Sequence, residues 1–291
     1  AFVEEEGASF GGGLVGSKAL VGKYTVENLK NLTNDEGLSF YDAAKNFGLN
    51  PDELENYVLR KGDVKALLEL HVEQGNVLYT KSIPLGIVEA IVGIKQLAVT
   101  LTGMANHAGT TPMNLRRDAL VAASNIISFV EHCAMHEAFD TTVATVGKIW
   151  CFPNVTNVIP GKVTFTIDIR DIRTEGIQRV EQLIKEEVKR ISDERGLQYS
   201  VNLVGESDPV KLSEKIVSVI QRVAEKLNVN FLRMNSGAGH DSALLTEVTD
   251  VGMIFVPSIE GISHAPKEDT KYEDLKTGCD VLLNALVDLA Q

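Results

Sequence analysis

Three short stretches of the sequence carry residue types that can hold a divalent cation. Glu4, Glu5 and Glu6 follow one another in VEEEG, His71 stands in LHVEQG, and His264 stands in GISHAP. We expect the glutamates and His71 at strand ends, and His264 in a loop after the strand MIFVP. Ligands gather where the strands of an α/β sheet end, and imidazole and carboxylate are zinc ligands. These residues therefore predict a metal site, with a second glutamate available as a base.

Three further patterns could carry chemistry, but a structural interpretation suits each of them better. His132 and His136 have the i, i+4 spacing of a zinc pair, yet histidines are also favoured at the end of a helix. GGGLVG at 11–16 matches G-x-G-x-x-G without the preceding hydrophobic strand that dinucleotide binding requires. SGAGHDS at 236–242 contains Ser, His and Asp, but triad members this close in sequence do not normally converge. The glycines around His240 indicate instead a backbone that approaches a ligand closely.

The composition of the 291-residue chain excludes several classes of partner. Lys and Arg number 28 and Asp and Glu number 40, which gives a net charge of −12. Such a chain repels phosphate backbones and anionic lipid, so we expect neither nucleic acid nor membrane as partner. The apolar run 85–94 is far shorter than the roughly 20 residues of a membrane helix. Cys133, Cys151 and Cys279 have no CxxC spacing, which argues against a disulfide framework and favours a cytoplasmic location.

The elements that must position these residues fall into three parts of the chain. The first and third parts mix helices with single strands, and the middle part alternates strands with two long helices. The expected helices are 24–32, 39–48, 50–62, 116–137, 174–195, 213–227 and 271–289, and the expected strands are 68–72, 95–104, 142–150, 162–170, 198–204 and 251–257. The middle part thus has the order βαββαβ of a small ferredoxin-like domain. We predict an α/β fold in which a domain formed by 1–92 and 207–291 is interrupted by an inserted domain, 93–206.

Six separated motifs, in this order, resemble one known family: EEEG, LHVEQG, NHAGTTPMNLRRDAL, TNVIPGKVTFTIDIR, SGAGHDS and FVPSIEGISHAPKE. They resemble the amidohydrolases of the M20 metallopeptidase clan that cleave N-carbamoyl groups, namely N-carbamoyl-L-amino acid hydrolases, allantoate amidohydrolases and β-ureidopropionases. The resemblance implies a zinc-peptidase-like α/β catalytic domain with an inserted lid domain that also forms a homodimer. Family members carry a His-x-Asp pair upstream of the glutamates, so we expect this chain to lack the family's N-terminal segment.

Carried over motif by motif, the resemblance implies a site with two divalent metal ions: zinc, manganese or cobalt. Glu5 matches the general base, and Glu6, His71 and His264 match metal ligands. The positions that match substrate contacts are Gln74, His107, Asn157, Arg170 and Gly239. His107 would also be catalytic, because it would hold the developing oxyanion in the active site of the partner subunit.

The activity implied by the resemblance is hydrolysis of the C–N bond of a carbamoyl group on a small carboxylate, with release of ammonia. N-carbamoyl-L-amino acids, allantoate and β-ureidopropionate all share a carboxylate and a urea-like group, and the motifs do not choose among them. Two alternatives stay open from the sequence. One is a truncated, non-catalytic chain that binds a ligand or dimerises, and the other is a dipeptidase of the same clan.

Overall fold

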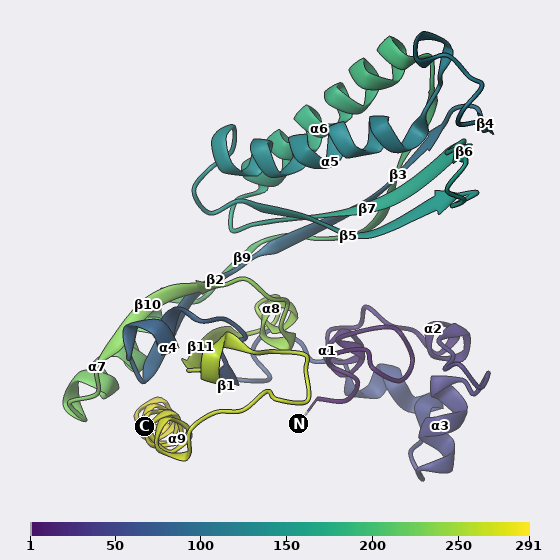
Figure 1. Cartoon of the computed structure of the whole chain (residues 1–291). Helices are drawn as coiled ribbons and strands as arrows, with labels where there is room; N and C mark the ends of the chain where they lie inside the picture. Colours follow the sequence, from purple (N-terminus) through teal and green to yellow (C-terminus); the bar gives the residue numbers. More distant parts are fainter. Residues whose placement is uncertain (1) are drawn as a thin grey trace. The chain divides into compact units, whose positions relative to one another are not determined.

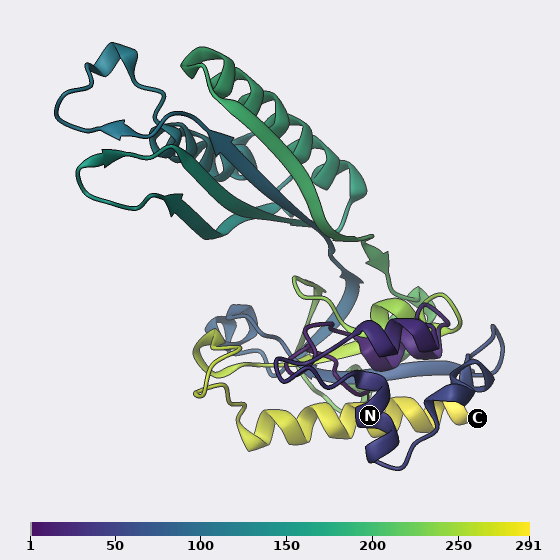
Figure 2. The same cartoon turned by 90° about the vertical axis from the view of Figure 1, so that its right-hand side faces the viewer.

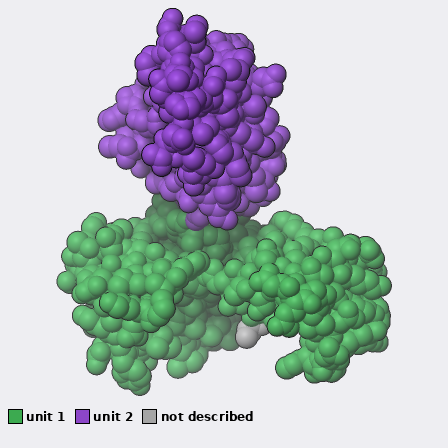
Figure 3. All heavy atoms as spheres, turned by 45° about the vertical axis from the view of Figure 1, so that its right-hand side comes forward, with its two compact units in different colours: residues 1–91, 210–291 green, residues 92–209 purple. Residues whose placement is uncertain are grey.

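Two compact units make up the part of the chain that the computed structural model describes, residues 2–291. The first unit combines the chain up to Ile91 with Val210–Gln291, and the second is the continuous segment Val92–Pro209 (Figure 3). Unit 2 is therefore inserted into the chain of unit 1. The sequence placed the boundaries after residues 92 and 206, and the structure places them after Ile91 and Pro209.

A mixed five-stranded sheet forms the centre of unit 1 (Figure 1). Its strands, in spatial order, are β1 (Ala66–Val72), β11 (Asp250–Val256), β2 (Leu85–Ile91) and β10 (Phe231–Ser236), with the short β9 (Val210–Lys211) paired to β2. β1 and β11 run parallel, with Val72 opposite Val256. Because parallel strands end at the same edge of a sheet, the loop after His71 emerges beside the loop that carries His264.

Helices flank this sheet and complete the core of unit 1. They are α1 (Val15–Leu20), α2 (Val26–Asn31), α3 (Phe40–Asn46), α4 (Val77–Lys81), α7 (Glu214–Lys226), α8 (Asp241–Leu245) and α9 (Tyr272–Ala290), with 3₁₀ turns η1 (Pro51–Tyr57) and η3 (Ile259–Gly261). α7 and α9 pack closely on the strands at two glycines. A Cβ at Gly252 of β11 would lie 2.3 Å from Ile216 Cγ2 of α7, and a Cβ at Gly278 of α9 would lie 2.6 Å from Val256 Cγ1. A larger side chain at either position would push the helix away from the sheet.

Unit 2 is an antiparallel four-stranded sheet with two long helices on one face (Figure 1). The strands, in spatial order, are β5 (Val143–Phe152), β7 (Lys162–Asp171), β3 (Gly93–Thr102) and β8 (Gln198–Ser207). The helices are α5 (Ala119–His136) and α6 (Thr174–Arg195), and they cover the alternate residues of β7 that point to one face, Val163, Phe165, Ile167 and Ile169. A ribbon of β4 (Asn106–His107) and β6 (Val158–Ile159) and the turn η2 (Met113–Leu115) complete the unit.

The βαββαβ order predicted for the middle of the chain, and with it the α/β fold class, is confirmed. The sequence missed β2, although the apolar run 85–94 contains it. Leu85–Val88 is buried on both faces of the sheet, so the strand shows no alternation between apolar and polar residues. The short β9 and β10 were missed as well. Within residues 2–291, no helix is long and apolar enough to cross a membrane.

Candidate active site

Residues from separate segments of unit 1 line a cavity of about 300 Å³. Four residues that the sequence singled out are among them, namely Glu5, Glu6, His71 and Gly239. The remaining lining residues are Phe2, Leu14, Glu69, His240 and Asp241. The polar part of the wall therefore consists of carboxylates and imidazoles, the side chains that bind divalent cations.

Glu6, which lines this cavity, lies beside Gln74 and His264, although Gln74 and His264 are 190 residues apart in the sequence. The Gln74 amide nitrogen Nε2 donates to Glu6 Oε1 over 3.3 Å and lies 3.2 Å from His264 Nε2. His264 Nε2 lies 3.4 Å from Glu6 Oε2. Two ligand atoms about 2.05 Å from a tetrahedral zinc ion are roughly 3.3 Å apart. Glu6 and His264 are therefore spaced as two ligands of one ion.

The loops that present these groups are fixed by hydrogen bonds at unusual backbone positions. Gln74 has φ 57° and His264 has φ 55°, both in the left-handed region that residues other than glycine seldom adopt. Gln74 N donates to Ser258 Oγ over 3.0 Å, which ties the loop after β1 to the loop after β11. The Glu73 carboxylate accepts from two amides at the start of α4, each over 2.8 Å. His264 N donates to Glu268 Oε2 over 3.1 Å, so hydrogen bonds restrain the loop of His264 as well.

The three consecutive glutamates lie in a turn, so the prediction that they end a strand was wrong. Leu14 N donates to Glu5 O over 2.9 Å, and the neighbouring main-chain groups bond to residues at the start of α1 in the same way. The Glu4 carboxylate is used inside the loop, where Oε1 accepts from Phe10 N over 2.8 Å. Because the carbonyl oxygens of Glu4 and Glu5 bond to the start of α1, they do not pair with a strand. Glu5 and Glu6 nevertheless reach the cavity.

A second cluster, formed by Glu69, His71 and His240, was not predicted from the sequence as a set. One potential ligand atom of each residue lies within 4.8 Å of those of the other two. Glu69 and His71 are two residues apart on β1 and so point to the same face, while His240 immediately precedes α8. The rings of His71 and His240 meet edge to face with centroids 4.7 Å apart, and Phe255 lies against both. Glu69 Oε1 lies 3.9 Å from His240 Nδ1, and Glu69 Oε2 accepts from Ser242 Oγ over 2.5 Å.

Burial sets the charge states around this cluster. His240 is 4% exposed, and desolvation, together with the nearby His71, lowers the pKa of its imidazole to about 3. Desolvation also raises the pKa of Glu69, against the opposing hydrogen bond from Ser242, and it raises the pKa of Asp241. Asp241 Oδ1 is buried without a hydrogen-bond partner among the described residues. The cavity wall thus contains one buried carboxylate oxygen that lacks a donor among the described residues, a chemistry that a divalent cation fits.

Ser236 and His240 of the SGAGHDS motif do make contact, which corrects the argument that they are too close in sequence to converge. Ser236 Oγ lies 2.7 Å from His240 Nε2 and donates to Ala238 O over 3.1 Å. A serine nucleophile must be open to its substrate, whereas Ser236 is 1% exposed. The contact therefore orients His240 and does not form a hydrolase pair. Two signals in the sequence pointed to the cluster: the glycines around His240, and Glu69 at strand spacing from His71.

The other residues predicted from the sequence lie in unit 2, at opposite ends of its sheet. His107 belongs to β4, and Asn157 O accepts from Ala108 N over 2.9 Å, so His107 and Asn157 are close neighbours. Arg170 lies near the other end of β7, where Nε donates to Asp168 Oδ1 over 2.7 Å. Figures 1 and 2 both show the β4–β6 ribbon at the end of the sheet away from the start of β3. Unit 2 by itself therefore does not bring His107 and Arg170 together.

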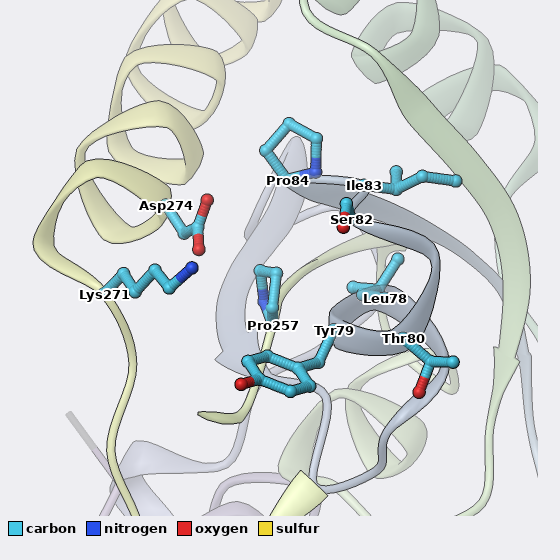
Figure 4. Close-up of a pocket in the computed structure, with 9 residues that line it drawn as sticks. All are labelled: Leu78, Tyr79, Thr80, Ser82, Ile83, Pro84, Pro257, Lys271 and Asp274. Carbon is cyan, nitrogen blue, oxygen red and sulfur yellow. The ribbon is translucent and has the colours of Figure 1, made fainter. Parts of the chain in front are cut away.

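A larger cavity lies elsewhere in unit 1 and contains none of the residues predicted to be functional. It measures about 550 Å³ and lies between α4, Pro257 and the start of α9 (Figure 4). Its charged groups are Lys271 and Asp274, which have opposite sign and do not form a set of metal ligands. Size alone therefore does not identify the site.

His132 and His136 pair only with each other, as their helical spacing predicts. Their ring centroids are 4.8 Å apart on α5, and neither belongs to a group of three potential metal ligands within residues 2–291. The structural interpretation of this pair fits the geometry.

Comparison with known proteins identifies the family. The profile of Peptidase family M20/M25/M40 matches residues 1–288. The chain belongs to this family. The N-carbamoyl-L-amino-acid amidohydrolase of Pseudomonas sp. (strain NS671) is 41% identical over 99% of the M20 chain and 70% of its own length. The allantoate amidohydrolase of Escherichia coli (strain K12) is 38% identical over 100% of the chain and 70% of its own length.

A solved structure extends the likeness of this M20 chain to three dimensions. An amidase of the hydantoinase/carbamoylase family from Burkholderia multivorans superposes with a TM-score of 0.90 at 31% sequence identity. The match covers 99% of this chain and 69% of that one. The M20 membership expected from six separated motifs is thereby confirmed.

Proposed function

We propose that this M20 chain is a metal-dependent amidohydrolase that hydrolyses the C–N bond of a carbamoyl group on a small carboxylate and releases ammonia. The observation that carries the proposal is the spacing of Glu6 and His264 as two ligands of one ion, with Glu5 on the same cavity. Relatives named for N-carbamoyl-L-amino acids and for allantoate support a carbamoyl group as the target. These relatives favour an amidohydrolase over the dipeptidase alternative.

The chain's own carboxylates and imidazoles have separate roles in the proposed reaction. We assign Glu6, His71 and His264 as ligands of two divalent cations, which can be zinc, manganese or cobalt. Such ions, when bound, would supply Lewis-acid chemistry that lowers the pKa of water and makes it a nucleophile near neutral pH. Glu5 is placed on the cavity wall to take a proton from the attacking water and to return it to the leaving nitrogen. Ammonia then leaves, and the remaining carbamate loses carbon dioxide.

The length of the sheet in unit 2 supports action as a homodimer. Arg170 lies eight residues along β7 from Lys162, which is roughly 26 Å at about 3.3 Å per residue. His107 lies beyond the Lys162 end of the strand. A small carboxylate is far shorter than this distance, so it cannot touch His107 and Arg170 of one copy of unit 2. If both residues contact the substrate, one of them comes from a second copy of the chain.

The polar groups assigned to the substrate suit a carboxylate and a urea-like group. Arg170 offers a planar pair of donors for the carboxylate, and its contact with Asp168 orients the guanidinium. The amides of Asn157 and Gln74 suit fixed polar groups, and His107 is assigned to the developing oxyanion. The backbone at Gly239 lines the cavity of unit 1. These groups serve N-carbamoyl-L-amino acids, allantoate and β-ureidopropionate equally well.

The cysteines support a reducing compartment, and we propose the cytoplasm. Cys133, Cys151 and Cys279 are all free thiols, with Cys133 buried and Cys279 exposed. Disulfide-free cysteine usage of this kind is typical of proteins kept in reducing surroundings.

The test is ammonia release from the three ureido carboxylates in parallel, with and without a chelator. Chelation should abolish turnover, and zinc, manganese or cobalt should restore it. His71→Ala should lose metal and nearly all turnover, whereas His132→Ala on α5 should lose neither. Turnover that survives excess chelator would exclude a metal-dependent reaction, and metal loss from His132→Ala would move the site to α5.

A further inference from the structure

The larger cavity of unit 1 is lined by none of the residues assigned to the proposed reaction. It measures about 550 Å³ and lies between α4 with the turn that follows it, Pro257 and the start of α9 (Figure 4). Small-molecule sites in proteins usually measure roughly 300–1,000 Å³. The volume of this cavity therefore suits a small ligand, and the side chains of its wall indicate the chemistry of that ligand.

Two side chains of opposite charge line the cavity at the start of α9. Lys271 immediately precedes the helix, and Asp274 lies in its first turn. Figure 4 shows both side chains extending from this part of the chain toward Pro257. One wall of the cavity thus presents an ammonium group and a carboxylate to the same space.

Within residues 2–291, neither of these two charged groups has a hydrogen-bond or ion-pair partner. Lys271 Nζ lies 5.9 Å from the centroid of the Tyr79 ring, a cation–π contact that leaves its three N–H donors available. Burial raises the pKa of Asp274, although the nearby charge of Lys271 opposes this rise. A ligand can therefore form charge-assisted hydrogen bonds with both residues without breaking an existing ion pair.

Much of the remaining wall is apolar. The apolar lining residues are Leu78, Ile83, Pro84 and Pro257. Leu78 is fully buried, and its amide donates to the Glu73 carboxylate over 2.8 Å, which fixes this side of the cavity. The two proline rings have little conformational freedom of their own. This part of the wall can therefore cover an apolar side chain of a ligand without first becoming ordered.

We propose that this cavity is a binding site for a free α-amino acid with an apolar side chain. The ammonium group of the ligand pairs with Asp274, its carboxylate pairs with Lys271, and its side chain packs against the apolar wall. An anion alone would leave Asp274 unpaired, and a cation alone would leave Lys271 unpaired. An α-amino acid carries both charges on one carbon atom, so a single small molecule satisfies both residues.

Other classes of ligand fit this wall less well. A divalent cation takes several ligand atoms from the protein, and Asp274 is the only described lining residue with a carboxylate. A phosphate group is attracted by clustered cations, whereas Lys271 is the only described lining residue with a positive charge and the whole chain carries −12. A free amino acid is also the chemical class that hydrolysis of an N-carbamoyl-L-amino acid leaves behind. The binding site does not depend on that reaction, because it shares no residue with it.

Titration of the 291-residue chain with L-leucine tests the chemistry of the ligand. Binding is followed by calorimetry in excess chelator, so that bound metal does not contribute. Two analogues are titrated in parallel, isocaproate, which lacks the ammonium group, and isoamylamine, which lacks the carboxylate. L-leucine should bind, and the affinity for each analogue should be about 10-fold or more lower, because one charged hydrogen-bonding group is missing. Absence of L-leucine binding, or an analogue that binds as tightly as L-leucine, would overturn the inference.

Two substitutions locate the bound amino acid. Lys271→Met and Asp274→Asn each remove one charge and keep most of the size of the side chain, so each should lower the affinity for L-leucine by about 10-fold or more. Lys276→Met is the matched control, because Lys276 also lies on α9 but pairs with Asp280 over 2.6 Å and does not line the cavity. This variant should bind L-leucine as the wild type does. Unchanged affinity in Lys271→Met and Asp274→Asn would overturn the inference.

A measurement on the wild-type protein covers the case in which a variant does not fold. In methyl NMR of the isoleucine-labelled chain, added L-leucine should shift the resonances of Ile83, which lines the cavity. The resonances of Ile169, which is buried in unit 2, should stay in place. Binding without a shift at Ile83 would place the amino acid elsewhere and overturn the inference. None of these experiments measures turnover or needs bound metal, so their failure would leave the proposed function intact.

Discussion

Two inactive variants, mixed, should restore the activity that each one lacks. The variants are His107→Ala and Arg170→Ala, and the reasoning rests on the roughly 26 Å between the ends of β7 at about 3.3 Å per residue. If a short substrate contacts both side chains, each active site takes His107 from one copy of unit 2 and Arg170 from the other. A mixed dimer then contains one site with both side chains intact and one site with neither.

The expected magnitude follows from counting sites. Random reassociation of equal amounts of the two variants makes about half of the dimers mixed. Since one of the two sites in a mixed dimer works, the mixture should reach about a quarter of wild-type turnover. The turnover of each variant alone should fall by about 10²–10³-fold, the usual loss when one oxyanion or charge-stabilising donor is removed. The restored activity should therefore stand far above the background.

The assay is ammonia release, followed over time after the two variants are allowed to exchange subunits. Mixing His107→Ala with Asn157→Ala is the matched control, because both residues lie at the same end of the sheet and should not complement each other. Exchange is verified with one subunit carrying an affinity tag. If the first mixture stays at background after exchange, the two residues do not act from separate copies, and the homodimer argument from β7 fails.

Three further changes test separate parts of the structure. Glu5→Gln should lower kcat by about 10²–10⁴-fold with metal content kept, whereas Glu6→Gln should lose metal as well; equal metal content in the two variants would contradict these roles. Burial acts to raise the pKa of Glu181, but hydrogen bonds from Lys185 and Lys95 outweigh it and the pKa is lowered. Glu181→Gln should therefore lower the free energy of unfolding in urea by about 1 kcal/mol at pH 7. Below the unfolded pKa of about 4.3, this difference should shrink and vanish as the pH falls through the lowered pKa of Glu181 in the folded protein. A difference in unfolding free energy that stays as large at pH 3 as at pH 7 would count against this explanation. Ser39→Ala should cost about 1 kcal/mol, because Ser39 Oγ accepts from Asp42 N over 3.0 Å at the start of α3, and an unchanged unfolding midpoint would contradict the cap.

Local patterns in the sequence were sufficient to predict the long helices and strands of unit 2. Along β7 every second residue is apolar, and the period of two identified both the strand and the face that α5 and α6 cover. The start of α3 was equally predictable, since the helix expected at 39–48 begins at Ser39, which caps α3. Patterns failed where burial is complete: β2 is apolar without alternation, so nothing in its sequence distinguished a central strand from any other apolar run.

The sequence also determined which residue types are available for chemistry, because motifs such as LHVEQG and GISHAP are written in consecutive residues. It did not determine which of these residues lie next to one another in the folded chain. The parallel pairing of β1 with β11 brings the loops of Gln74 and His264 together across 190 residues, and the start of α8 brings His240 to Glu69. These contacts depend on strand order and helix packing, which are set by the burial of the whole core and leave no local period in the sequence. The sequence thus determined which side chains are available as metal ligands, and the tertiary structure determined which of them face one another.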